Sequence, residues 1–282
     1  MGDWHNLKSS DGYRVPLALY EPKGTVKAVF LMLPALGVKA KFYGHVAKGL
    51  ADHGVATVLF EQRGHGESDC KPSKNIKVGY QHYLDIDLPL AMDWTKKRFQ
   101  GVPFFVGGHS LGAHMSNYIA AARGHEIAGL VHLACVFPYY GFYPRKEAVL
   151  LNILCAAIPP LTYMLGYYPG KMFGFGGKEH RQVMLDWREW ALTGNYDFGD
   201  IKDVEDRMAA YRGKLLSISF EDDHLASEKA LRKPNAVMSS SEVKHVHLTR
   251  KEQGDYIGHF DWAKKPVGAV NAINEWIDTC LT

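Results

Sequence analysis

The sequence predicts an α/β fold in which helices cover both faces of a mostly parallel central sheet. Apolar runs of strand length alternate with longer helical patterns along the chain, which is typical of such sheets. The run 27–33 is almost continuously apolar, as a strand buried on both faces requires. The alternation stops at residues 137–211, so we expect a single domain, 1–282, that carries a helical cap insertion at 137–211.

The first half of the chain shows each expected element in order. The strand 14–20 follows the turn Ser9-Ser10-Asp11-Gly12, and Pro34 ends the strand 27–33. Helix 43–53 has apolar residues at helical spacing and precedes Gly54, a suitable residue for a helix C-terminus. By the same criteria we expect, in order, a strand at 56–60, a helix at 80–97, a strand at 102–106 and a helix at 111–122.

The second half begins with a strand at 127–136, after which the regular spacing is lost. The segment 137–211 contains helix-like stretches and loops separated by Pro and Gly. Regular spacing resumes with a strand at 215–220, and a strand at 243–248 and a helix at 266–280 follow it. No internal repeat is apparent, which argues against a repeat architecture.

Composition and charge exclude several classes of protein. Apolar residues make up 46% and charged residues 22% of the chain, which is an ordinary globular mixture. The net charge of +3 is small and no basic block occurs, so nucleic acid is not an expected partner. The four cysteines lack metal-type spacing and the N-terminus lacks a secretory pattern, so we expect reduced thiols, a cytoplasmic location, and no metal or other cofactor.

One uncharged stretch, 148–166, approaches the length of a membrane-spanning helix. It contains Pro159-Pro160, and adjacent prolines remove backbone donors and clash with the preceding turn. We therefore expect the helix to break near Ile158 and to be a buried helix or part of a lid, with no transmembrane segment. Contact of this stretch with a lipid surface stays open.

The motif Gly108-His109-Ser110-Leu111-Gly112 carries the strongest functional signal. By composition the pattern Gly-x-Ser-x-Gly would arise by accident roughly 0.1 times in such a chain. Its context is specific, because an expected strand precedes Ser110 and an expected helix follows it. The glycines leave room where a strained turn brings neighbouring backbone too close for a Cβ atom. We predict Ser110 as a nucleophile, against the alternative of a plain glycine-rich turn.

From residue 27 onward the chain resembles the α/β-hydrolase superfamily, most closely the serine hydrolases grouped with monoacylglycerol lipases and S33 aminopeptidases. Three further segments resemble a bacterial group of predicted hydrolases and indicate no substrate: Gly166-Tyr167-Tyr168-Pro169-Gly170, Trp187-Arg188-Glu189-Trp190 and Gly258-His259-Phe260. The resemblance implies the α/β-hydrolase fold and a metal-independent Ser-Asp-His mechanism. It also implies a structural role for the loop Glu61-Gln62-Arg63-Gly64-His65-Gly66-Glu67-Ser68, with Arg63 and Ser68 forming hydrogen bonds.

The acid and the base should follow the nucleophile in the order Ser, Asp or Glu, His. The strand 215–220 runs into three carboxylates, and the family pattern Gly-x-x-Asp selects Asp223 among them. Phe220 stands in place of the Gly of this pattern, so Asp222 remains the alternative. His259 lies between the last strand and the last helix, where the family places its base. His245 and His247 alternate on one face of a strand, which favours a structural role for them.

Two backbone amides should bind the negative oxygen of the tetrahedral intermediate. One is the amide of Leu111, directly after the nucleophile. The other should come from the loop Pro34-Ala35-Leu36-Gly37, which stands where many relatives have His-Gly-x-Gly. By position the donor is Leu36, and Ala35 is the alternative.

The insertion is rich in aromatic residues, which bears on the substrate. Fourteen of the chain's 34 aromatic residues lie between Phe137 and Phe198, and a cap over Ser110 would favour an apolar or aromatic acyl substrate. Equally, these residues could serve only to pack the cap. We predict a carboxylic ester hydrolase; amidase, aminopeptidase, thioesterase or acyltransferase activity would use the same residues. A binding protein without catalysis is the alternative from another class.

Overall fold

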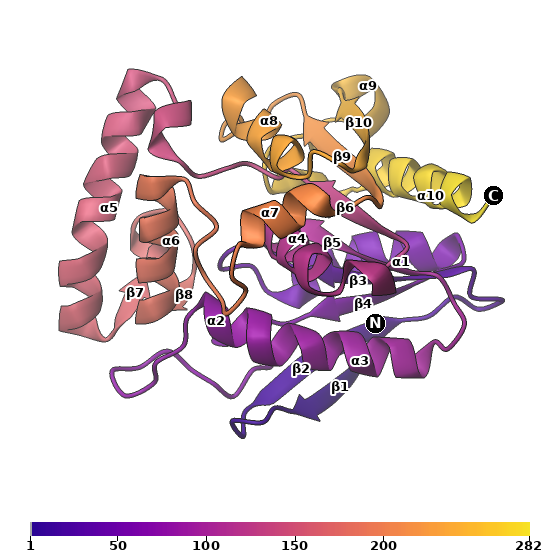
Figure 1. The fold of residues 1–282 in the computed structure, drawn as a ribbon, viewed down its shortest axis with the longest axis horizontal. Helices are drawn as coiled ribbons and strands as arrows, with labels where there is room; N and C mark the ends of the chain where they lie inside the picture. The colour runs from indigo at the N-terminus through magenta and orange to yellow at the C-terminus, as the bar shows by residue number, and fades with distance from the viewer. Residues whose placement is uncertain (1) are drawn as a thin grey trace.

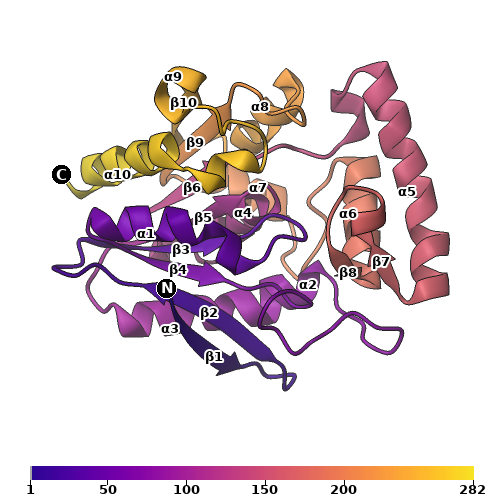
Figure 2. The same cartoon turned by 180° about the vertical axis from the view of Figure 1, so that it is seen from behind.

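The computed structural model describes residues 2–282, and in this part of the chain an eight-stranded sheet lies between two layers of helices (Figures 1 and 2). Neighbouring strands follow the order β1-β2-β4-β3-β5-β6-β9-β10. β2 runs antiparallel to both of its neighbours, and the other five pairs are parallel. The predicted fold class, a mostly parallel sheet with helices on both faces, is therefore confirmed.

The bounds of the elements are as follows. The strands of the large sheet are β1 (Asp3–Lys8), β2 (Arg14–Tyr20), β3 (Ala28–Leu33), β4 (Val55–Phe60), β5 (Phe104–His109), β6 (Gly129–Leu133), β9 (Lys214–Phe220) and β10 (Glu242–Leu248); β7 (Tyr167–Pro169) and β8 (Lys178–His180) form a separate hairpin. The α-helices are α1 (Gly44–Asp52), α2 (Tyr80–His82), α3 (Leu88–Arg98), α4 (Leu111–Arg123), α5 (Arg145–Leu165), α6 (Arg181–Thr193), α7 (Val204–Ala210), α8 (Glu228–Val237), α9 (Arg250–Gln253) and α10 (Val267–Leu281).

Two apolar cores, one on each face of the sheet, hold the layers together. Helices α1 and α10 bury side chains such as Leu50 and Trp276 against one face. Helices α3 and α4 bury side chains such as Met92 and Met115 against the other face. Burying each such side chain contributes about 1.5–3 kcal/mol. Because β3, β4, β5 and β6 are buried along their whole length, their sequences are mostly apolar.

Most of the predicted elements end within three residues of the predicted bounds, and two differences have physical causes. β1 was not expected; its side chains are largely exposed, and its backbone pairing with β2 leaves no apolar pattern in the sequence. The helix expected at 80–97 contains a π turn at Tyr83–Asp87. This turn lies just before Pro89, whose missing amide hydrogen cannot complete a regular α-helical ladder.

The expected break near Ile158 is wrong, because α5 continues through Pro159 and Pro160 to Leu165. Pro159 removes the hydrogen bond that the carbonyl oxygen of Cys155 would accept within the helix. In the structure, Nε of Arg188 on α6 donates to this oxygen at 2.9 Å. The neighbouring helix thus supplies the donor that proline removes, and the two-proline step does not end the helix.

The inserted segment, residues 137–211, leaves the sheet after β6 and returns to it at β9. Its helices α5 and α6 and the hairpin of β7 and β8 lie together at one end of the molecule (Figure 1). Among the described residues, α5 is the one helix long and apolar enough to cross a membrane, by length and composition alone. Only 17% of its apolar window is buried, so α5 is not a core helix.

Candidate active site

Ser110 lies at a sharp turn between β5 and α4, where the backbone adopts φ 51° and ψ −111°. This conformation costs a non-glycine residue about 1–3 kcal/mol unless its surroundings hold it. The amide of Ser110 donates to the carbonyl oxygen of Leu133 on β6 at 2.9 Å, and its carbonyl oxygen accepts from Ala113 and His114 in the first turn of α4. The strand, the turn and the helix together fix the hydroxyl at the carboxyl edge of the sheet.

The glycines of the motif are required by close contacts with β3. A Cβ atom on Gly108 or on Gly112 would lie 2.2 Å from the carbonyl oxygen of Leu33. Gly107 is restricted in the same way, because its Cβ would lie 2.0 Å from the carbonyl oxygen of Val131. Real Cβ atoms do not approach backbone oxygens so closely, so the predicted reason for the flanking glycines is confirmed.

Asp223 and His259 form a buried pair beside Ser110. Oδ2 of Asp223 lies 2.8 Å from Nδ1 of His259, and the two side chains are 1% and 2% exposed. Oδ1 of Asp223 accepts from the amide of Leu225, which fixes the carboxylate in its loop. The alternative carboxylate, Asp222, instead forms an exposed ion pair with Arg250. Of the two, only Asp223 contacts the histidine.

Phe220, at the position where the family pattern has Gly, packs against an aromatic ring. It stacks on Trp262 with centroids 5.3 Å apart and ring planes 12° from parallel. The other histidines of the region lie elsewhere: His245 and His247 contact the hydroxyl of Ser219 on the sheet, in agreement with the structural role predicted for them.

Contacts of the loop 34–37 separate its two candidate amides. The amide of Ala35 donates to the hydroxyl of Tyr43 at 3.0 Å, and this hydroxyl lies 2.8 Å from Nδ1 of His109. The amides of Leu36 and Leu111 have no hydrogen-bond acceptor within residues 2–282, and both residues line the same cavity as Ser110. Leu36 rather than Ala35 is therefore free to donate to a ligand.

Burial keeps the ring of His109 neutral, and the contacts of the Tyr43 hydroxyl indicate the direction of the hydrogen bond between them. Burial together with the neighbouring His259 holds the pKa of His109 well below its ordinary value, so the ring is neutral. The hydroxyl of Tyr43 already accepts from Ala35, so its own hydrogen is best placed on Nδ1 of His109. The rings of His109 and His259 lie 4.9 Å apart, so this pair packs directly against the base.

The cavity beside Ser110 has a volume of about 360 Å³ and lies between the sheet and the inserted segment. His259 and Ser110 both face it, and its walls are mainly apolar. The inserted segment contributes Tyr143, Leu150, Leu151, Leu154, Phe175, Trp187 and Trp190. Only part of the predicted aromatic cap thus lines the cavity; Phe137, Tyr168, Tyr196 and Phe198 are instead buried in the core.

His114 is a cavity residue that the sequence analysis missed. It lies one helical turn after Ser110 on α4, so the four-residue spacing could have indicated it. Its Nδ1 lies 2.6 Å from the hydroxyl of Tyr196, and burial lowers its pKa to about 4. His114 is therefore a neutral wall residue.

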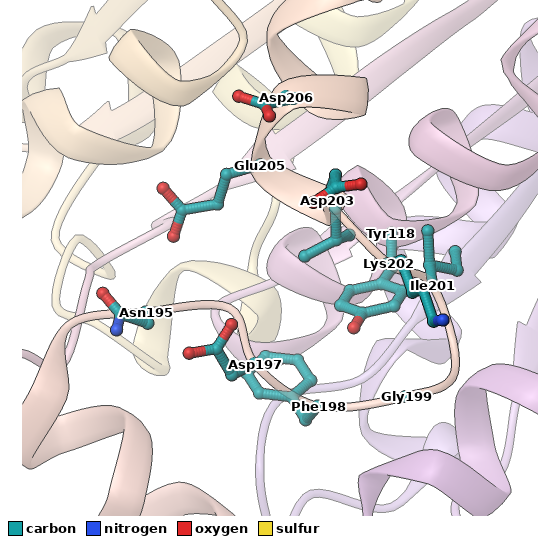
Figure 3. A pocket seen from close by; sticks show the side chains of 11 residues that line it. Tyr118, Asn195, Asp197, Phe198, Gly199, Ile201, Lys202, Asp203, Glu205 and Asp206 are labelled. Atoms are coloured by element: carbon teal, nitrogen blue, oxygen red, sulfur yellow. The ribbon is translucent and has the colours of Figure 1, made fainter.

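A second hollow, of about 430 Å³, is open and acidic (Figure 3). Carboxylates gather around it from α7 and the preceding loop: Asp197, Asp203, Glu205 and Asp206. It contains none of the predicted site residues and no serine or histidine. Within residues 2–282, no group of three His, Cys, Asp or Glu side chains is arranged to hold a metal ion.

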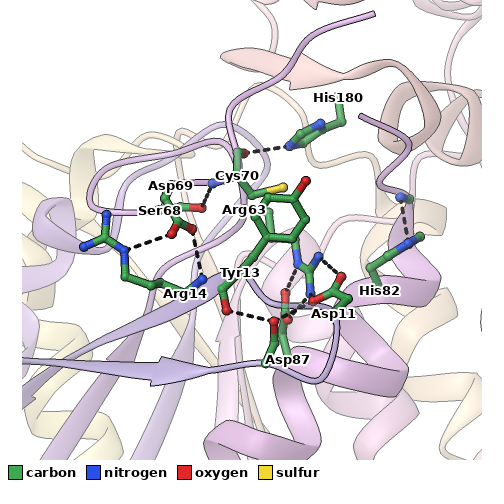
Figure 4. Close-up of polar contacts among 12 residues, drawn as sticks. Asp11, Tyr13, Arg14, Arg63, Ser68, Asp69, Cys70, His82, Asp87 and His180 are labelled. Atoms are coloured by element: carbon green, nitrogen blue, oxygen red, sulfur yellow. Dashed lines mark hydrogen bonds and ion pairs between the residues drawn. The ribbon is translucent and has the colours of Figure 1, made fainter. Parts of the chain in front are cut away.

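The loop 61–68 has the structural role that was predicted (Figure 4). The buried guanidinium of Arg63 bridges Asp87 on the π turn and Asp11 in the turn before β2. Burial opposes ionisation of Asp11, but Arg63 outweighs it and lowers the pKa of Asp11 to about 2. The hydroxyl of Ser68 accepts from the amides of Gly64 and Cys70, which closes the loop.

Comparison with known proteins identifies a family and several relatives to which the chain is similar. The model of the family described as serine aminopeptidase, S33, matches residues 24–248. Monoglyceride lipase from Homo sapiens is 27% identical over 129 residues, which are 46% of this chain and 42% of that protein. The matching stretch therefore spans less than half of this relative.

Solved structures are similar over almost the whole chain. Est1E from Butyrivibrio proteoclasticus, solved with ferulic acid bound, has a TM-score of 0.68 at 19% identity and covers 98% of this chain and 99% of its own. A thermostable carboxyl esterase from Bacillus coagulans has a TM-score of 0.65 at 15% identity, with both chains covered completely, 100% each. At such identities the likeness shows the fold alone, and the predicted α/β-hydrolase fold is confirmed.

Proposed function

Since the chain belongs to the serine aminopeptidase S33 family of α/β hydrolases, we propose that it hydrolyses carboxylic esters through Ser110, His259 and Asp223. The observation that carries the proposal is the buried contact between Asp223 and His259 beside a cavity that Ser110 also lines. These three groups follow the chain order Ser, Asp, His that this fold uses. The name of the lipase relative supports an ester rather than an amide as substrate.

In the proposed reaction, Oγ of Ser110 attacks the acyl carbon while Nε2 of His259 takes the hydroxyl proton. Asp223 accepts a hydrogen bond from Nδ1 of His259 and stabilises the imidazolium that forms. The amides of Leu36 and Leu111 donate to the oxygen that becomes negative. His259 then gives its proton to the leaving alkoxide, and a water molecule, activated by the same histidine, releases the acid from Ser110.

The cavity walls support an acyl group that is apolar or aromatic. Leu151, Leu154 and Trp187 provide apolar surface on the side of the inserted segment, and burial of such a group is worth roughly 25 cal/mol per Å² of apolar area. Glu147 and His224 are the exposed polar residues at the rim, where the alcohol part of the ester can stay in contact with water.

A fluorophosphonate probe tests the nucleophile directly, because it phosphonylates only an activated serine. The wild type should be labelled, and Ser110→Ala should not. Esters of p-nitrophenol with increasing acyl length, together with aminoacyl amides and acyl-CoA, then identify the leaving group and the acyl preference. An unlabelled wild type would contradict the proposal, and turnover of amides alone would replace the ester with an amide.

We further propose that α5 rests on a lipid surface from which the substrate enters. Seven of the twelve large apolar side chains that are exposed in the described chain lie on α5 and the loop after β7: Val149, Leu150, Ile153, Tyr163, Met164, Met172 and Phe173. Val149, Ile153 and Met164 follow helical spacing, so they share one face of α5. Leu150 also lines the cavity, which connects this face to Ser110.

Charge favours an anionic lipid surface for this face. Arg145 and Lys146 begin α5. At its other end, Arg181 lies over the ring of Tyr163 at 5.0 Å, and Lys178 lies over the ring of Tyr167, just after the helix, at 4.3 Å. Such an arrangement, an apolar face with cationic ends, is typical of helices that lie in a membrane interface. Because the inner side of α5 packs on α6, we propose that the helix lies flat on the lipid and does not span it.

Sedimentation with vesicles tests this proposal. Vesicles of phosphatidylglycerol and phosphatidylcholine in equal parts should bind the wild type more strongly than pure phosphatidylcholine, and added salt should weaken the binding. The double variant Ile153→Asp, Met164→Asp should lose binding, whereas Val267→Asp, at a 62% exposed position on α10, should keep it. Equal binding by both variants, or none by the wild type, would contradict a docking role for α5.

A further inference from the structure

Two loops from distant parts of the chain touch next to the cavity. The oxyanion loop, residues 34–37, carries the amide of Leu36, and the glycine loop, residues 174–177, forms part of the cavity wall. Gly37 has φ 77°, and a Cβ atom on it would lie 2.3 Å from the amide nitrogen of Gly177. The position of one loop therefore constrains the position of the other.

A buried carboxylate holds the glycine loop in this place. Glu179 on β8 is 1% exposed, and its Oε1 accepts from the amide of Gly177 at 2.6 Å. Its Oε2 lies 2.9 Å from Nε2 of His65, in the loop after β4. The contact is a link between the inserted segment and the sheet domain across 114 positions of sequence.

The loop of His65 is itself tied to the oxyanion loop. Glu61, which precedes it, accepts from the amide of Ala40 at 3.0 Å, shortly after the oxyanion loop ends. A Cβ atom on Gly177 would also lie 2.9 Å from Cε1 of His65. His65 and Glu179 thus both adjoin Gly177 at the contact between the two loops, and Glu61 ties the loop of His65 to the residues that follow the oxyanion loop.

From these contacts we infer that the pair of Glu179 and His65 is a positioning device, which keeps the glycine loop on the oxyanion loop so that the Leu36 amide is aimed at the reacting oxygen. This inference rests on the proposed hydrolase function. Neither residue lines the cavity, so they act through the two loops and not on the substrate. Breaking the pair should affect the rate of the chemical step more than substrate binding.

The charges around His65 give this device a pH dependence. Burial opposes the charged ring, but Glu179 and, behind it, Glu61 outweigh burial and raise the pKa of His65; Lys71 acts in the opposite sense. His180 lies near the same carboxylate and stays neutral, because burial lowers its pKa to about 4. Since the folded-state pKa of His65 is raised, the charged pair is complete below the ordinary histidine range and weakens as the pH rises through the raised value.

The test uses Glu179→Gln, which keeps the volume and removes the charge. We expect kcat to fall about tenfold, a fraction of the ~10²–10³ loss for removal of an oxyanion donor, with little change in KM. The part of the alkaline decline of kcat that the charged pair causes should disappear, and Glu179→Asp should restore part of the rate. Glu189→Gln, a change at an exposed carboxylate on α6, is the matched control and should resemble the wild type.

Hydrogen exchange supplies a readout that does not require activity. The protection of the glycine-loop amides, taken relative to their intrinsic exchange rate at each pH, should be lower in Glu179→Gln and in His65→Gln than in the control, and lower in the wild type at alkaline pH than at acidic pH. If Glu179→Gln and His65→Gln both kept the kcat and the amide protection of the wild type, the inference would be wrong. A wild type that no fluorophosphonate labels would instead overturn the proposed function, while the exchange experiment still tests the device.

Discussion

Tyr43→Phe should destabilise the protein strongly for the loss of one oxygen atom. The hydroxyl accepts from the amide of Ala35 and contacts Nδ1 of His109, and all three groups are buried. Removing it leaves two buried polar atoms without partners, each of which costs about 1–3 kcal/mol. Because the buried hydroxyl also carried a cost of desolvation, we expect a net loss of about 2–4 kcal/mol.

Tyr80→Phe is a matched control inside the same chain. Tyr80 is also fully buried, but its hydroxyl has no hydrogen-bond partner in the described structure. Removing this hydroxyl strands no other group, so Tyr80→Phe should stay within about 1 kcal/mol of the wild type or exceed it. The comparison separates the loss of an oxygen atom from the loss of its hydrogen bonds.

Urea and thermal unfolding measure the difference between the two variants. For a chain of this size, Tyr43→Phe should lower Tm by on the order of 3–7 °C, and Tyr80→Phe should leave it almost unchanged. Since Ala35 adjoins Leu36, kcat of Tyr43→Phe should also fall. If the two variants unfolded at the same urea concentration, the hydrogen bonds assigned to Tyr43 would contribute nothing to the free energy of unfolding, and the reasoning would be refuted.

Two further predictions concern the acid and the helix α5. Asp223→Asn should lower kcat by about 10³–10⁴ because the histidine loses its orienting carboxylate. Asp222→Asn should stay within about twofold of the wild type, since its ion pair is exposed. If an ester assay showed the larger loss for Asp222→Asn, Asp222 would be the acid. Arg188→Met should leave the carbonyl of Cys155 without a donor, so amides near the prolines of α5 should exchange faster; unchanged protection would refute the role of Arg188.

The elements that could be predicted from the sequence are those in which burial produces a recognisable run or spacing of apolar residues. β3, β4, β5 and β6 are buried from end to end, so their apolar runs reveal them directly. The glycines beside Ser110 also reveal a local cause, the approach of Leu33. In contrast, β1 depends on backbone pairing with β2, and the carbonyl oxygen that Pro159 leaves free in α5 accepts from Arg188 of another helix. Neither contact is visible in a local sequence pattern.

The candidate site divides in the same way. Chain order and loop position were enough to indicate Ser110 and His259, because both follow from where strands end. Family position favoured Asp223 over Asp222 and Leu36 over Ala35 but left both choices open. Each depends on which group meets a partner in three dimensions, Arg250 for Asp222 and Tyr43 for Ala35.

The turn before β2 lies at the surface, yet through Asp11 it helps to neutralise the buried guanidinium of Arg63. Asp11 supplies one of the two carboxylates around a guanidinium that is 2% exposed, and Asp87 supplies the other. A protein trimmed to begin at Arg14 would retain the whole parallel sheet, yet it would leave this buried cation with half of its counter-charge. Shortening or tagging the chain for production is therefore safer at the far end, after α10, than at the hairpin of β1 and β2.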